Sequence, residues 1–239
     1  MGIVEAIADA SMTVDLATTS KRELNAALHA LSGEAGPRSW LVRNPGGQHA
    51  LAAGVNAPVA ITIDGHAGYY CAGMNQQAEI TIRGNAGVGV AENMMSGRVH
   101  VLGDASQSAG ATAHGGLLVI DGNASARCGI SMKGVDIVVK GNIGAMSAFM
   151  AQSGTLVVLG DAGEALGDSL YEARLFVRGT VTSLGADCIE KEMRPEHLAI
   201  LTDLLAAAGC DAAVKPEQFK RYGSARQLYN FHVDNAGAY

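Results

Sequence analysis

The side chains best suited to chemistry, seven histidines and four cysteines, are scattered along the chain. Cys71, Cys128, Cys188 and Cys210 form no CxxC pair, and no histidine belongs to an HxH or HExxH motif. Metal sites and nucleophile–base pairs need such convergent groups. We therefore expect no catalytic residue and no bound metal or cofactor, and we expect the cysteines to be buried free thiols in a reducing cytoplasm.

Some of the histidines and one glycine-rich segment could still take part in a site. His100 occupies an outward strand position and is expected to be solvated or interfacial, whereas His66 and His114 lie in loops and could approach a partner's site. The segment GNAGVGV (84–90) is similar to a dinucleotide-binding loop, but no amphipathic helix follows it. Because the same glycines recur throughout the chain, we interpret this segment as a turn.

Bulk composition excludes several classes of protein. The net charge of −6 and a pI near 5.6 provide no electrostatic footprint for nucleic acid. The first residues contain neither a basic signal-peptide region nor a long apolar run, so we expect a cytoplasmic protein without a membrane span. Aromatic residues make up only 5% of the chain, and its core must therefore be built mainly from aliphatic side chains.

The elements that position all these residues follow an exact repeat. Seven glycines stand 19 residues apart: Gly65, Gly84, Gly103, Gly122, Gly141, Gly160 and Gly179. A five-residue strand precedes each of them, and its second and fourth positions are aliphatic in all seven copies. Alternation with period two places these positions on one face of each strand. The other face carries polar or charged residues at many places.

Seven strands with one apolar face and no tight hairpin between them predict an all-β solenoid. We expect a right-handed parallel β-helix of seven 19-residue coils, on the order of 34 Å long, with short helical caps at both ends. A hexapeptide β-helix would have an 18-residue coil, and the calcium-binding nonapeptide repeat is absent.

The residue after each marker glycine is usually Asn or Asp, which predicts a turn with positive φ at the glycine. Stacked Asn side chains could form hydrogen bonds along the solenoid axis. Since Asp104 and Thr180 interrupt the Asn column, we expect it to contribute little.

The flanks differ from the repeat and predict three regions: a helical cap and lead-in over 1–53, the β-helix over 54–193, and a helix with an aromatic tail over 194–239. Ser20 and Glu23 form a capping box before one helix, and Pro195 opens the other.

The tail concentrates aromatic and basic residues, a composition typical of protein interfaces. The candidate partner contacts are Phe219, Arg221, Tyr222, Arg226, Tyr229, Phe231 and Tyr239. The alternative is that the tail folds back along the side of the solenoid.

Over residues 54–193 the glycine corners and the 19-residue repeat resemble the GXGXG-domain family. This family includes the C-terminal β-helix of the glutamate synthase large subunit and the β-helical subunit of formylmethanofuran dehydrogenase. The segments RELNAALHAL (22–31), CIEKEMRPEHL (188–198) and SARQLYNFHVDNAGAY (224–239) are similar to stand-alone β-helix subunits such as that of N-methylglutamate synthase.

The resemblance implies a non-catalytic structural subunit in a cytoplasmic hetero-oligomer. Its expected partners are a glutaminase-type amidotransferase subunit and a synthase subunit that holds FMN and an iron–sulfur cluster, with this chain bridging them and helping to wall the ammonia path. Two alternatives remain: the β-helical component of a formylmethanofuran dehydrogenase or formyltransferase complex, and an autonomous carbohydrate-active β-helix enzyme.

Overall fold

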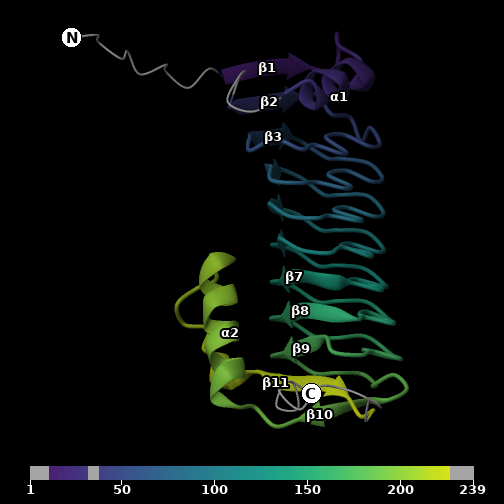
Figure 1. The fold of residues 1–239 in the computed structure, drawn as a ribbon, viewed down its shortest axis with the longest axis vertical. Helices are drawn as coiled ribbons and strands as arrows, with labels where there is room; N and C mark the ends of the chain where they lie inside the picture. Colours follow the sequence, from purple (N-terminus) through teal and green to yellow (C-terminus); the bar gives the residue numbers. More distant parts are fainter. Residues whose placement is uncertain (1–10, 32–37, 227–239) are drawn as a thin grey trace, which may run out of the picture.

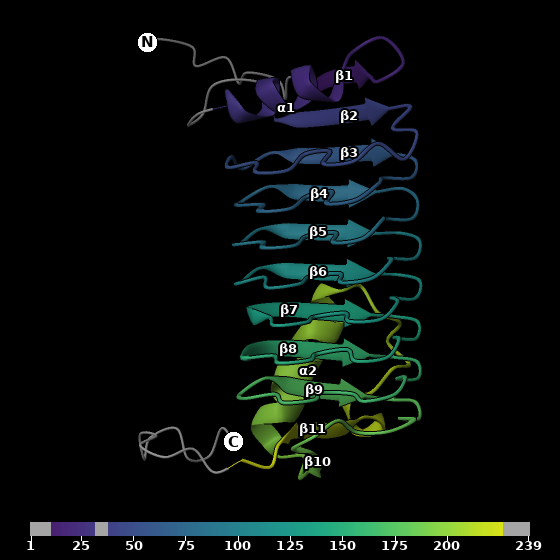
Figure 2. The ribbon, with the colours of Figure 1, turned by 90° about the vertical axis from the view of Figure 1, so that its right-hand side faces the viewer.

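The structure is a computed structural model that describes residues 11–31 and 38–226. These residues form a stack of coils with a sheet along one side and turns along the other (Figures 1 and 2). None of the described helices has the length and apolar character needed to cross a membrane. The elements are β1 (Ser11–Asp15), α1 (Lys21–His29), β2 (Ser39–Arg43), β3 (Ala60–Asp64), β4 (Glu79–Ile82), β5 (Arg98–Val101), β6 (Leu117–Ile120), β7 (Lys133–Val139), β8 (Ser153–Val158), β9 (Arg174–Val177), β10 (Cys188–Lys191), α2 (Pro195–Ala207), the 3-10 turn η1 (Pro216–Gln218) and β11 (Lys220–Ser224).

The strands confirm the predicted solenoid. Strands β1 to β9 pair in parallel in chain order, and from β3 onward each is joined to the next by one coil. The sheet begins before the exact repeat, because β1 pairs with β2 and β2 with β3. All fourteen aliphatic positions of the seven repeated strands point into the lumen and are at most 1% exposed. The lumen is therefore a dry aliphatic core.

The two ends are closed differently. Helix α1 begins at the predicted capping box formed by Ser20 and Glu23. It buries Leu24 and Leu28 against the first coil. At the other end, Ala165 N–H donates to Ser183 Oγ eighteen residues later, so the last coil is shorter than the repeat. Strand β11 then inserts between β9 and β10, antiparallel to both. The C-terminal cap is thus made by strands, and α2 lies along the side of the sheet (Figure 1).

The marker glycines are required for close packing rather than for positive φ. Only Gly65 of the seven has a positive φ, at 143°, so the predicted left-handed turn is wrong for the other six. A Cβ atom on Gly122 would lie 2.8 Å from Gly103 O and 2.4 Å from Asp104 Oδ1. The same collision recurs along the column, because each coil passes directly over the glycine of the coil before it.

The residues after the marker glycines form a continuous ladder, which corrects the expectation that Asp104 and Thr180 interrupt it. In each step a side-chain acceptor receives the backbone N–H of the equivalent residue in the next coil, at 2.7–3.0 Å. The members are His66, Asn85, Asp104, Asn123, Asn142, Asp161 and Thr180. Asp accepts as well as Asn does, and Thr180 ends the ladder, where only its N–H is needed.

Positive φ angles occur elsewhere in the coil, at three alternate residues of the turn side. In one coil these are Ser108 (φ 60°), Gly110 (φ 66°) and Thr112 (φ 52°). Ser108 and Thr112 donate N–H to the next coil, and Gly110 donates to the preceding one. A left-handed conformation costs a non-glycine residue about 1 kcal/mol or more. The hydrogen bonds to both neighbouring coils hold the backbone there.

We predict that Gly122→Ala destabilises the fold by about 3 kcal/mol, because the new methyl group must push apart two coil backbones. Gly209→Ala is the matched control: φ is 63° but no atom lies within 4 Å of the new Cβ, so the cost is about 1 kcal/mol of backbone strain. Urea unfolding of both variants measures the difference. Equal losses would contradict the close-approach explanation.

We also predict that Asp104→Ala lowers the unfolding free energy by about 1 kcal/mol, since the N–H of Asn123 loses its acceptor. Asp104→Asn keeps an Oδ1 acceptor in the same place and should remain close to the wild-type stability. Thermal or urea unfolding of the two variants tests the ladder. Equal destabilisation by both substitutions would show that the position requires a carboxylate and would contradict the prediction.

Candidate interaction surfaces

The outer face of the sheet changes character along the stack. Its outward positions are Thr62, Thr81 and His100 on β3 to β5, and Val119, Val138, Val157 and Phe176 on β6 to β9. The last four are completely buried, in a cluster that includes Leu201 and Leu205 of α2. Helix α2 therefore covers the apolar half of the outer face and leaves the polar half open.

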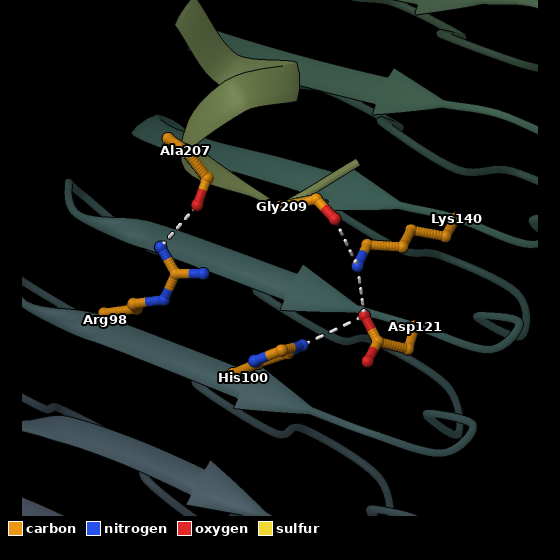
Figure 3. Close-up of polar contacts among 6 residues, drawn as sticks. All are labelled: Arg98, His100, Asp121, Lys140, Ala207 and Gly209. Atoms are coloured by element: carbon orange, nitrogen blue, oxygen red, sulfur yellow. Dashed lines mark hydrogen bonds and ion pairs between the residues drawn. The ribbon is translucent and has the colours of Figure 1, made fainter. Parts of the chain in front are cut away.

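Helix α2 is fastened at its C-terminal end by cations from the sheet (Figure 3). Arg98 on β5 donates to Ala207 O at 2.7 Å, and Lys140 Nζ lies 3.5 Å from Gly209 O. The last turn of α2 contains no basic residue of its own. Positive charge stabilises helix C-termini, so the sheet supplies the groups that the helix lacks.

His100 belongs to the same polar cluster. Asp121 Oδ1 is 2.9 Å from His100 Nε2 and 2.8 Å from Lys140 Nζ. Partial burial raises the pKa of Asp121, but hydrogen bonds from Lys140 and His100 outweigh it and hold the pKa below its usual value. The carboxylate thus orients Lys140 toward the end of α2. His100 contacts its own fold rather than standing free in solvent.

The N-terminal end of α2 depends on a buried histidine that the sequence analysis did not identify. His197 is 1% exposed, and its Nδ1 accepts the Arg194 backbone N–H at 3.2 Å. Its ring centre lies 6.4 Å from that of Phe176. Burial and then the nearby charge of Arg221 lower the pKa of His197. The imidazole is therefore neutral at neutral pH and caps the helix.

The described part of the chain contains no cluster of side chains suited to a metal ion and no disulfide bond. Across residues 11–31 and 38–226, no group of three or more His, Cys, Asp or Glu side chains could hold a metal ion. All four cysteines are free, and Cys71, Cys128 and Cys188 are buried as expected, whereas Cys210 is partly exposed. Burial raises the pKa of Cys71 and of Cys128 to about 12, so both remain unreactive thiols.

For the predicted tail interface, the structure favours self-packing where it describes the residues. Phe219, Arg221 and Tyr222 are 4–6% exposed. Pairing with β9 directs Tyr222 into the lumen cluster, and Arg221 Nη1 donates to Glu192 O at 3.2 Å. These three side chains hold β11 in place, so they do not form an open surface. Tyr229, Phe231 and Tyr239 lie outside the described residues.

The turn side carries exposed apolar residues that were not predicted from the sequence. We call them the turn-side row: Tyr69, Met74, Met95, Met150 and Tyr171, each 40–56% exposed. They occupy segments between strands of four different coils. They form two pairs in adjacent coils, Met74 with Met95 and Met150 with Tyr171, and the coils between the pairs carry polar residues at these positions. Contiguous exposed apolar area marks contact sites when it is large. The signal in the sequence was their spacing relative to the marker glycines, which places Met95 and Tyr171 at the same coil position.

The fold is a parallel β-solenoid. The polar clusters described above hold α2 against the sheet. No protein-family model matches the chain. It is 66% identical over 226 residues to Protein GlxC of Rhizobium meliloti (strain 1021), an alignment that covers 95% of this chain and 99% of that protein. The chain therefore belongs to the same family as Protein GlxC.

We predict that protonation of His197 destabilises the protein. Because the folded-state pKa is lowered, the stabilisation is complete above the unfolded value of about 6.5 and is lost as the pH falls toward the folded value. The loss cannot exceed about 1.4 kcal/mol per pH unit. His197→Gln retains an acceptor at the third helical position but does not titrate. Urea unfolding between pH 7 and pH 5 should show the wild type losing more stability than this variant, and parallel profiles would contradict the prediction.

Proposed function

We propose that this chain is a non-catalytic scaffold subunit of a glutamate-synthase-like complex, most closely of the N-methylglutamate synthase type. The observation that carries the proposal is the uninterrupted solenoid with a dry, filled lumen. A reaction centre usually disturbs a repeat by an insertion or by inward polar groups, and the fourteen inward strand positions are all aliphatic. A second support is the 66% identity to Protein GlxC, which covers nearly the whole length of both chains.

The solenoid suits a bridging role because of its mechanics. Every coil is hydrogen-bonded to its neighbours on the strand side, at the ladder and on the turn side. Bending the stack would break several of these bonds at once. In the proposed complex, the chain holds a glutaminase-type subunit and a flavin subunit at a fixed separation and forms part of the wall of the ammonia path. FMN and the iron–sulfur cluster belong to the flavin subunit.

The test is purification of the N-terminally tagged chain from its native source, followed by mass spectrometry of the proteins bound to it. We expect a glutaminase-like subunit and an FMN and iron–sulfur protein in fixed stoichiometry with the chain. Recovery of the chain alone would contradict the proposal. Recovery with an amidohydrolase-like protein would instead assign the role of the β-helical component in a formylmethanofuran dehydrogenase complex.

Paired variants sharpen the same experiment. Met74→Lys with Met95→Lys places two charges on the turn-side row, and we expect loss of at least one partner because apolar contact area becomes charged. Thr62→Lys with Thr81→Lys adds the same charge on the open strand face, where both threonines are only partly buried. We expect this control to retain the complex. The opposite result would place the partner contact on the strand face.

A further inference from the structure

A pair of like charges lies at the C-terminal end of the sheet, where β11 runs between β9 and β10 (Figure 1). Lys191 of β10 and Arg221 of β11 are direct cross-strand partners. Like charges placed opposite each other on antiparallel strands repel and destabilise the pair. None of the ion pairs in the described part of the chain involves either residue. The fold therefore brings two cations together without pairing either of them with a carboxylate of its own.

Arg221 is buried, and its hydrogen-bonding capacity is only partly used. The residue is 4% exposed. Its Nη1 donates to Glu192 O at 3.2 Å, whereas its Nε–H has no hydrogen-bond partner among the described residues. Burying a cation is unfavourable unless an anion and hydrogen bonds compensate for the lost hydration. The guanidinium therefore presents an unused donor where an anionic acceptor would be strongly favoured.

The surrounding charges add to this excess of positive charge. Burial, and then the nearby cations Arg174 and Arg194, lower the pKa of Arg221. Within the described residues, only the carboxylate of Glu196 raises this pKa. The pKa of Lys191 is also lowered, first by burial and then by Arg221 and Arg194. Each cation of the pair thus lies in a positive local field, which an anion between them would relieve.

Both cations line a small surface cleft, together with Glu172, Gly223 and Ser224. A Cβ atom on Gly223 would lie 3.3 Å from Lys191 Cδ, so the lysine side chain crosses this glycine. The cleft has a volume of about 10 Å³, which is room for one water-sized group. Glu172 forms no ion pair with Lys191 or Arg221. The cleft therefore admits a single oxygen atom of a ligand, and the rest of the ligand must lie outside it.

We propose that this cleft is a carboxylate-binding site, in which one ligand oxygen accepts the Nε–H of Arg221 and faces Nζ of Lys191. Guanidinium groups bind carboxylates through short, charge-assisted hydrogen bonds. The carboxylate belongs either to a small organic acid or to an Asp or Glu side chain of a partner protein. A water molecule would accept the same hydrogen bond but would not offset the charge, so occupancy must depend on the anion.

The Nε–H resonance of Arg221 in ¹H–¹⁵N NMR spectra of the isolated full-length chain reports on the site directly. Sodium chloride is replaced stepwise by sodium acetate at constant ionic strength and neutral pH. We expect a saturating change in the chemical shift of this resonance, because a carboxylate oxygen becomes its acceptor. A resonance that does not respond to acetate would mean that the cleft holds water or binds chloride equally well, and would overturn the proposal.

Two lysine variants separate the site from general electrostatic attraction. Lys191→Gln removes one cation of the pair, and we expect the acetate affinity measured at Arg221 to fall at least about fivefold. Lys220→Gln is the matched control, because Lys220 alternates with Arg221 along β11 and its Nζ lies 3.0 Å from Glu190 Oε2. We expect this control to stay within about twofold of the wild-type affinity. Equal losses in the two variants would overturn the proposal.

The same variants identify the source of the carboxylate when the tagged chain is purified from its native source. Loss of a bound protein from Lys191→Gln but not from Lys220→Gln assigns the carboxylate to that partner. Retention of every bound protein, or recovery of both variants alone, assigns it to a small organic acid. The acetate experiment uses the isolated chain, so the site is tested separately from the proposed scaffold role.

Discussion

Each coil of this protein must lie within hydrogen-bonding distance of the next around its whole circumference, and the rest of the structure depends on that requirement. Strands in a sheet are about 4.8 Å apart, so the corners and turns must keep the same spacing. At the marker glycines this leaves no room for a Cβ atom, as the contact between Gly122 and Gly103 shows. At the residue after each glycine, the same close spacing brings a side-chain acceptor within reach of the backbone N–H in the next coil. These hydrogen bonds form the ladder from His66 to Thr180.

On the turn side, the close spacing of the coils forces some non-glycine residues into strained backbone conformations. Residues such as Thr112 and Met146 adopt left-handed conformations that glycine would adopt without strain. Their N–H groups are bonded to neighbouring coils, so the strain is offset by contacts that only the stacked structure offers. A stack stabilised in this way is stiff and has a continuous core. These properties suit the proposed scaffold role.

A regular repeat offers many similar surfaces, and specificity therefore arises where the regularity ends. Helix α2 covers half of the outer face, and its two ends are held by different chemistry: Arg98 and Lys140 at the C-terminal end, and buried His197 at the N-terminal end. Strand β11 runs antiparallel to β9, and β10 forms the last strand of the sheet. Among the described residues, the polar strand face and the turn-side row are surfaces that the chain's own elements leave exposed.

The solenoid, its 19-residue coil, its inward positions and the capping box of α1 could all be predicted from the sequence alone, because they depend on periodicity and on contacts between residues near in the chain. It misjudged the role of the marker glycines and the continuity of the ladder, because both are set by atoms one coil away. Three features became clear only in the folded structure: α2 lies beside the sheet, Arg221 and Tyr222 are buried, and His197 caps a helix. Those outcomes depend on which apolar faces meet, such as the outer face of β6 to β9 with α2, and contacts between such separate elements leave no periodic pattern in the sequence.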